Sequence, residues 1–209
     1  MAEDTAEAAH KLFAGPCDFV WGTQKSGDAL PPGKLPEVAF VGRSNAGKSS
    51  ALNTLCQQKT LARVSKTPGR TQLINLFALR GGQSRLVDLP GYGYAAVPDA
   101  IRRDWGKLIG GYLQTRDTLK TLAVIMDCRH PLTDLDEQML DWAQAYGRPC
   151  HVLLTKCDKL SRGAGAATLL QVRQALKARG PGFTAQLFSS HTPTGVDEAR
   201  AALAAALAA

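Results

Sequence analysis

Two kinds of hydrophobic pattern alternate along this chain. Short apolar runs, such as residues 149–155, are typical of strands buried on both faces of a sheet. Between them lie segments with helical periodicity; in one of these, Leu135, Met139 and Trp142 share one face. The pattern predicts strands at 36–41, 71–79, 85–89, 119–126, 149–155 and 183–189, and helices at 48–57, 99–114, 134–146, 166–179 and from 196 to the end.

Strands that alternate with helices predict an α/β fold with a mostly parallel, six-stranded sheet covered by helices on both faces. Gly81 and Gly82 predict a hairpin turn between the second and third strands. Residues 1–35 are expected to form a short helix and an extended, proline- and glycine-rich arm, and residues 36–209 a single domain. Ligands of such folds bind at the carboxyl ends of the strands.

A glycine-bracketed loop follows the first predicted strand and precedes the first long helix. It matches the phosphate-binding pattern G-x-x-x-x-G-K-[ST] with Gly42, Arg43, Ser44, Asn45, Ala46, Gly47, Lys48 and Ser49. The glycines let backbone N–H groups turn toward phosphates, the lysine adds charge against the β- and γ-phosphates, and the serine hydroxyl suits Mg²⁺. A glycine-rich turn before a surface helix is the alternative, but the strand before it and the helix after it favour a nucleoside triphosphate site.

A second loop, beginning at Asp88, follows the third strand. Its carboxylate can hold Mg²⁺ through a water molecule, and the N–H of Gly91 can bind a γ-phosphate. The same residues would also make an ordinary turn. Their place, 39 residues after Ser49 and directly after a strand, favours the phosphate-sensing role.

The base is predicted from the loop Thr155, Lys156, Cys157 and Asp158, which follows the fifth strand. A fixed carboxylate at Asp158 can accept hydrogen bonds from both donors of guanine, whereas adenine would present an unpaired acceptor. The stem of Lys156 can lie over the base plane. Phe188, Ser189 and Ser190 end the last strand, where backbone N–H groups can donate to the guanine O6. These residues predict guanine specificity.

Composition and charge indicate the location of the protein and the kind of partner that it binds. The hydrophobic fraction of 44% and charged fraction of 21% are those of a soluble globular protein, and no apolar run approaches the length of a membrane span. The start lacks the features of a secretory signal, and the five cysteines form no paired motif, so we expect a cytoplasmic protein without a membrane partner. The net charge of +7 favours a polyanionic partner, with a solvated basic surface as the alternative.

The order of these motifs resembles the EngB (YihA/YsxC) family of bacterial GTPases, within the TrmE-Era-EngA-EngB-Septin-like class. The resemblance covers roughly residues 12–207, and its most specific segments are Gly42-Arg-Ser-Asn and Pro90-Gly-Tyr-Gly-Tyr-Ala. It implies a Ras-like P-loop GTPase domain that hydrolyses GTP to GDP with Mg²⁺. It also implies a role in assembly of the large ribosomal subunit, through rRNA and ribosomal proteins, and a link to cell division and septation.

The resemblance also adds site residues. Thr71 matches the switch I threonine that ligates Mg²⁺ and touches the γ-phosphate, whereas the residues alone left Thr67 an equal candidate. Gly69 and Arg70 precede it in the same nucleotide-binding segment. Related GTPases often have Asn at the start of the guanine motif, where this chain has Thr155. We expect a monomer that binds GTP and GDP.

No catalytic residue is assigned. Where Ras-type proteins have a water-orienting Gln, this chain has Tyr92, which is either a substitute or a loop aromatic that meets a partner. Slow intrinsic turnover follows in either case. Asn45 is a candidate ligand for K⁺ beside the phosphates, and a loop-bracing role is its alternative.

Two rival functions remain. A P-loop kinase or metabolic NTPase would need a second phosphate site and a lid, and the guanine motif argues against it. A GTP-dependent septum or division scaffold without a ribosomal role is the other. If rRNA is the partner, basic residues around the switches are candidates for its phosphates: Lys59, Arg63, Lys66, Arg70, Arg102, Arg103 and Lys107.

Overall fold

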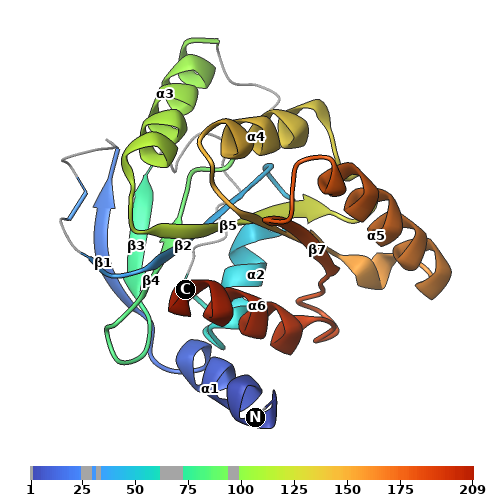
Figure 1. Ribbon diagram of the computed structural model, residues 1–209, viewed down its shortest axis with the longest axis horizontal. Coiled ribbons are helices and arrows are strands. Elements are labelled where there is room, and N and C mark those ends of the chain that lie inside the picture. The colour runs from blue at the N-terminus through green and yellow to red at the C-terminus, as the bar shows by residue number, and fades with distance from the viewer. Residues whose placement is uncertain (1, 25–29, 32–33, 62–72, 94–98) are drawn as a thin grey trace.

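A computed structural model describes residues 2–24, 30–31, 34–61, 73–93 and 99–209. Side chains at 2–5 and 99–102 are outside the description. In this part of the chain, six α-helices surround one seven-stranded sheet (Figure 1). The predicted α/β class is confirmed, and no described helix is both long and apolar enough to cross a membrane.

The sheet is mostly parallel, as predicted. Its strand order is β1-β3-β4-β2-β5-β6-β7, in which β4, β2, β5, β6 and β7 run parallel and β3 runs antiparallel to its neighbours. The glycine hairpin lies between β3 and β4, with positive φ at Gly81 (84°) and Gly82 (67°). The strands are β1 (Asp18–Thr23), β2 (Glu37–Gly42), β3 (Ile74–Ala78), β4 (Arg85–Asp88), β5 (Leu119–Asp127), β6 (Cys150–Thr155) and β7 (Phe183–Leu187).

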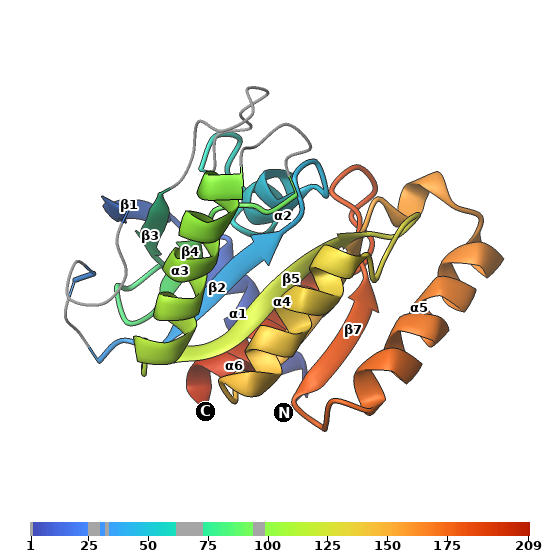
Figure 2. The same ribbon diagram turned by 90° about the horizontal axis from the view of Figure 1, so that it is seen from above.

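Helices cover both faces of the sheet, because successive side chains of each central strand point to opposite sides. Along β5, Leu122 and Val124 enter one apolar cluster and Ala123 and Ile125 the other. Helices α3, α4 and α5 pack on the first face and α1, α2 and α6 on the second (Figure 2). The helices are α1 (Ala2–Phe13), α2 (Lys48–Leu55), α3 (Asp99–Thr115), α4 (Asp134–Ala145), α5 (Arg162–Lys177) and α6 (Val196–Ala208).

Strand β1 is the seventh strand, which the sequence analysis did not predict. It pairs antiparallel with β3, and a bulge interrupts its register between Phe19 and Trp21. Phe19 is 62% exposed, although its ring meets Phe77 edge-to-face. The residues of β1 do not alternate between buried and exposed positions, so the sequence lacks the alternation of apolar and polar residues that predicts a strand.

The helix at the start of the chain packs against the last one. Phe13 is fully buried in the same cluster as Leu203. Arg200 of α6 donates to the Leu55 carbonyl oxygen (3.0 Å) at the end of α2 and to Nδ1 of His10 (3.1 Å) in α1. These bonds join three helices on one face of the sheet. The Leu55 carbonyl is available for such a bond because the last carbonyls of a helix receive no N–H from within the helix.

Candidate functional site

The phosphate-binding loop joins β2 to α2. β2 is buried throughout and ends at Gly42. Only glycine fits at this position, because a Cβ would lie 2.7 Å from the Ile125 carbonyl oxygen. Gly47, with φ of 99°, immediately precedes α2, and Asn45 also has a positive φ, 63°. The backbone therefore turns sharply between strand and helix, as the motif predicted.

The start of α2 suits an anion. The first N–H groups of a helix have no acceptor within it, and the helix dipole is positive there. α2 has no side-chain cap and no acidic residue in its first turn. By contrast, Ser161 caps α5, and Thr133 and Asp136 form a capping box on α4. A phosphate group would fill the role that side chains take in those two helices.

Lys48 and Asp88 meet beside this helix start. The Lys48 ammonium contacts Oδ1 of Asp88, and both side chains are largely buried. Asp88 ends β4 directly beside Phe40 of β2, so the pairing of two parallel strands brings the carboxylate to the loop. Ser49 follows Lys48 in the first turn of α2.

These residues fit Mg²⁺ bound with a nucleotide. The Ser49 hydroxyl and the Asp88 carboxylate are hard oxygen ligands at one edge of the sheet, and Mg²⁺ takes few such ligands because it keeps most of its water. Within the described residues, no group of three or more His, Cys, Asp or Glu side chains is placed to hold a metal. Water molecules and the nucleotide phosphates would complete the coordination of the ion.

The loop after Asp88 lies against the phosphate-binding loop. The Tyr92 N–H donates to the Gly42 carbonyl (3.2 Å), and the Ser44 N–H donates to the Tyr92 carbonyl (2.7 Å). A Cβ on Gly91 would lie 3.1 Å from the same Gly42 oxygen. The backbone at Gly91 therefore lies close against the phosphate loop, and its role as a γ-phosphate sensor stays a prediction.

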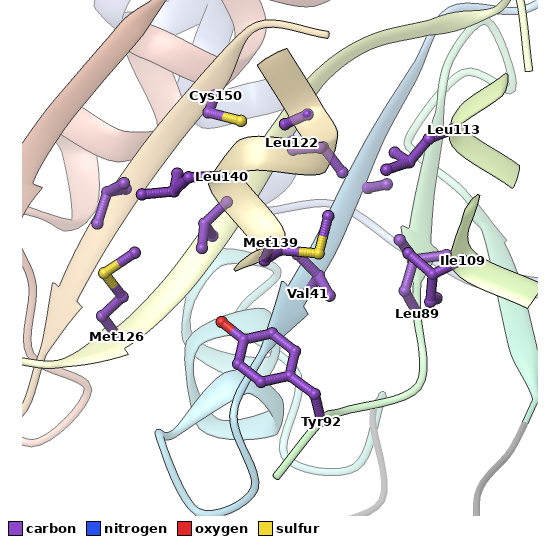
Figure 3. Close-up of a cluster of buried hydrophobic side chains, with 14 of the residues drawn as sticks. Val41, Leu89, Tyr92, Ile109, Leu113, Leu122, Met126, Met139, Leu140 and Cys150 are labelled. Atoms are coloured by element: carbon purple, nitrogen blue, oxygen red, sulfur yellow. The ribbon is translucent and has the colours of Figure 1, made fainter. Parts of the chain in front are cut away.

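The side chain of Tyr92 points into the core, among buried apolar side chains (Figure 3), while its backbone lies against the phosphate-binding loop. It is 4% exposed, and its hydroxyl donates to Oδ1 of Asp136 at 2.7 Å. Burial, together with the Asp136 carboxylate, raises the pKa of Tyr92 well above its ordinary value. A side chain buried in this way does not present itself to a partner, so that role considered from the sequence does not describe Tyr92.

The two loops predicted to recognise guanine meet at Asp158. Ser189 is fully buried, and its hydroxyl donates to Oδ1 of Asp158 at 2.7 Å. The same serine oxygen accepts the N–H groups of His191 and Thr192, each at 3.1 Å. The Ser189 bond, with further help from Lys159, holds the pKa of Asp158 below its usual range. The carboxylate is thus ionised and fixed, as an acceptor of the two guanine donors must be.

Thr155 and Lys156 tie this region to the phosphate loop. The Thr155 hydroxyl contacts the carbonyl oxygens of Ala46 and Met126, the latter at 3.0 Å. The Lys156 ammonium donates to the Asn45 carbonyl at 2.5 Å and pairs with Asp127 at 3.0 Å. Threonine at the head of the motif therefore still bridges the two loops.

Asp127, at the end of β5, is a site residue that the sequence analysis missed. Burial opposes ionisation of its carboxyl, but hydrogen bonds from Arg129, helped by Lys156, hold its pKa well below the usual value. The sequence could have indicated this residue, because Asp127 is an acidic residue at the carboxyl end of a buried strand, where ligands of such folds bind.

Most of the predicted site residues come together at the carboxyl edge of the sheet. Phe188 is buried, and its carbonyl accepts the Cys157 N–H at 3.3 Å, while Ser190 is exposed beside them. Gly69, Arg70 and Thr71, like the alternative Thr67, lie outside the described residues. The switch I assignment therefore remains a prediction.

Comparison with solved structures bears on the fold. A crystal structure of a probable EngB GTP-binding protein is similar with a TM-score of 0.67, over 82% of this chain and 98% of that one, at 16% identity. Era from Aquifex aeolicus, bound to GDP and AlF₄⁻, is similar with a TM-score of 0.63, over 83% of this chain and 56% of that one, at 19% identity. At these identities, the likeness shows the fold alone.

Sequence comparison reaches further. Residues 37–156 match the protein family described as "50S ribosome-binding GTPase". Probable GTP-binding proteins EngB are 63% identical over 170 residues in Azoarcus sp. (strain BH72), covering 81% of each chain, and 56% identical over 176 residues in Coxiella burnetii (strain RSA 493 / Nine Mile phase I), covering 84% of this chain and 85% of that one. Fold and site define a Ras-like P-loop GTPase. Within that class, the chain belongs to the EngB family.

Proposed function

We propose that this protein binds GTP and GDP and hydrolyses GTP slowly on its own. The observation that carries the proposal is the Asp158 carboxylate, which Ser189 holds ionised at the same sheet edge as the uncapped start of α2. The Asp158 carboxylate suits the donors of guanine, and the start of α2 suits phosphate. Asp158 selects the base, Lys48 neutralises the β- and γ-phosphates, and Gly91 detects the third phosphate.

Mg²⁺ would be held by Ser49, by Thr71 and, through water, by Asp88; when bound, it neutralises charge on the phosphates. Gly69 and Arg70 would approach the nucleotide with Thr71. Slow turnover is expected because the residue after Gly91 is the buried Tyr92, which leaves no side chain from that position to orient water. The remaining chemistry is positioning of the phosphates by the backbone of residues 42–49.

For Asn45, we propose a role as a K⁺ ligand. Its side chain is at an exposed position of the phosphate loop, while its carbonyl is engaged by Lys156. The amide oxygen is a suitable hard ligand for a monovalent cation, which would add positive charge where negative charge develops during hydrolysis. Bracing of the loop is the alternative role.

The partner we propose is the large ribosomal subunit, whose assembly the GTP-bound form assists. The matched family carries the description "50S ribosome-binding GTPase", and the net charge of +7 suits an rRNA surface. The protein would act as a monomer in the cytoplasm, docking with GTP and leaving after hydrolysis. Its link to cell division and septation would follow from ribosome supply.

Co-sedimentation with ribosomal subunits tests this partner. Purified protein would be centrifuged with large or small subunits in the presence of GDP or a non-hydrolysable GTP analogue. We expect binding to large subunits that is stronger with the GTP analogue. Absence of binding to either subunit, with intact GTP binding, would favour the alternative of a GTP-dependent division scaffold without a ribosomal role.

A further inference from the structure

Both neighbours of Gly91 are held by side chains of the α3/α4 layer. The Trp105 indole N–H of α3 donates to the Pro90 carbonyl at 2.9 Å. On the other side, the Tyr92 hydroxyl donates to Asp136 of α4 at 2.7 Å. The residue that we assign to the γ-phosphate is therefore fixed from both directions by packed helices.

The two anchors also contact each other. The rings of Tyr92 and Trp105 meet edge-to-face with centroids 5.6 Å apart, and Trp105 stacks on Trp142 of α4 at the same centroid distance. Aromatic pairs in such geometry add to the stability gained from burial alone. Figure 3 shows Tyr92 together with Met139 of α4 in the same buried cluster.

The acceptor for Tyr92 is itself rigid. Asp136 is 1% exposed, and its second carboxylate oxygen accepts the Thr133 N–H (3.0 Å) and hydroxyl (2.8 Å) in the capping box of α4. One carboxylate thus serves the end of a helix with one oxygen and Tyr92 with the other. A buried carboxylate shared in this way fixes the tyrosine in one orientation.

The backbone of Tyr92 transmits that position to the phosphate loop. Its N–H and carbonyl bond to Gly42 and Ser44 respectively, so a shift of Tyr92 would move Gly91 relative to the phosphate loop. GDP has no γ-phosphate for Gly91 to contact. A loosened anchor would therefore weaken GTP binding specifically.

We propose that Tyr92 is a positioning residue: its bond to Asp136 holds the Gly91 N–H where the γ-phosphate binds, and so the core raises the affinity for GTP relative to that for GDP. This inference rests on the proposed binding of GTP. It gives Tyr92 a role in nucleotide discrimination without contact with the nucleotide.

The chain offers a matched control in Tyr112. It is also fully buried in the α3 layer of the same cluster, and its hydroxyl donates to a buried carboxylate, Oε2 of Glu37, at 3.2 Å. Glu37 begins β2, however, whereas Gly42 ends it, so this pair lies at the opposite edge of the sheet. Loss of either hydroxyl removes one buried bond to a carboxylate, but only one of the two adjoins the nucleotide loops.

The experiment compares Tyr92→Phe, Tyr112→Phe and the unaltered protein. Each would be titrated with fluorescent GDP and with a fluorescent, non-hydrolysable GTP analogue in Mg²⁺, and its melting temperature measured. We expect Tyr92→Phe to weaken binding of the GTP analogue about tenfold, the size typical of a lost hydrogen bond to a charged group, with GDP affinity changed less than about twofold. Tyr112→Phe should lower the melting temperature and leave the affinity ratio unchanged.

Asp136→Ala supplies the second arm, because it removes the acceptor and keeps the tyrosine. It should lower the GTP-to-GDP affinity ratio, and adding Tyr92→Phe to it should lower the ratio no further. An unchanged ratio in Tyr92→Phe, or an equal loss of both nucleotides, overturns the positioning role while the proposed function stands. Failure of the unaltered protein to bind either nucleotide overturns both.

Discussion

Ser189 holds Asp158 by a 2.7 Å hydrogen bond, so a residue that follows β7 fixes the carboxylate that follows β6. The serine oxygen in turn accepts two backbone N–H groups of its own loop. The proposed recognition of guanine would therefore depend on a contact between two loops and not on Asp158 alone.

Substitution of that carboxylate should change the base that is bound. Asp158→Asn replaces one acceptor by a donor, so guanine loses a hydrogen bond while xanthine gains one. We expect GTP affinity to fall by about 100-fold, from the loss of a charged hydrogen bond and the unpaired donor that remains, with a gain for xanthosine triphosphate. Titration with labelled nucleotides measures both changes. Equal binding of ATP and GTP by the unaltered protein would contradict the whole assignment.

The Ser189 hydroxyl should extend nucleotide binding toward acid. Ser189 lowers the pKa of Asp158, so the ionised carboxylate persists as pH falls, and binding is lost only when pH passes through that lowered pKa. In Ser189→Ala, the pKa of Asp158 should rise toward its ordinary value, and the acid limit of GDP binding should move to higher pH. GDP titrations over a pH series that starts at about 7 and continues below the ordinary Asp pKa of about 3.9 would measure the shift. An unchanged acid limit would refute the role of this bond.

The phosphate loop makes separable contributions. Lys48→Ala should lose affinity for both GDP and GTP, because the positive charge that attracts the phosphates is removed. Ser49→Ala should spoil Mg²⁺ coordination and leave GDP bound better than GTP. Titrations in Mg²⁺ and in excess chelator distinguish the two variants, since only the first should remain defective without Mg²⁺. Unaltered affinity and turnover in both variants would show that the loop binds no phosphate.

Binding to the large subunit should depend on salt if phosphates are the contacts. Among the candidate residues with described side chains, Lys59, Arg103 and Lys107 are exposed. Loss of one true phosphate contact should reduce the slope of log affinity against log salt concentration by roughly one. Co-sedimentation of single alanine variants over a salt series, with the GTP analogue bound, measures this slope. Lys177→Ala, on the last turn of α5, is a control that preserves the switch regions. Binding that is identical with GDP and GTP and independent of salt would exclude this mode.

A K⁺ ligand at Asn45 should make hydrolysis cation-specific. GTP hydrolysis would be compared in K⁺ and Na⁺ at equal ionic strength, with and without large subunits. We expect faster hydrolysis in K⁺ and loss of that preference in Asn45→Ala, because the amide oxygen is removed while the Lys156 bond to the main-chain carbonyl remains. Equal rates in the two salts would leave Asn45 a structural residue.

The sequence predicted that three loops meet at one edge of the sheet, and it did so where chemistry constrains residue type. The glycines around Asn45, Asp88 at the end of β4 and Asp158 in the loop after β6 are the residue types that phosphate, metal and base recognition require, and all three loops lie at the predicted edge. Strand β1 escaped prediction because its pairing with β3 is made by backbone groups along a largely exposed strand. No periodicity in the side chains reports such a pairing.

Tertiary contacts account for the remaining differences. The sequence could not reveal that Tyr92 turns into the core, since that depends on Asp136, 44 residues away, being free to accept its hydroxyl. The bonds from Lys156 to Asn45 and Asp127 likewise depend on the register of β5 beside β6. Loops with matched motifs were predictable, whereas the side chains that brace them from neighbouring elements were not.

The order of the site along the chain has a consequence for synthesis. The phosphate-binding half lies within residues 42–91, but Asp158 reaches its fixed position only when Ser189 is present and β7 has paired with β6. A growing chain that stops short of that strand has its phosphate loop but lacks the brace for guanine. Because domains made on the ribosome acquire long-range contacts late, base selectivity would be acquired only as the last strand leaves the exit tunnel.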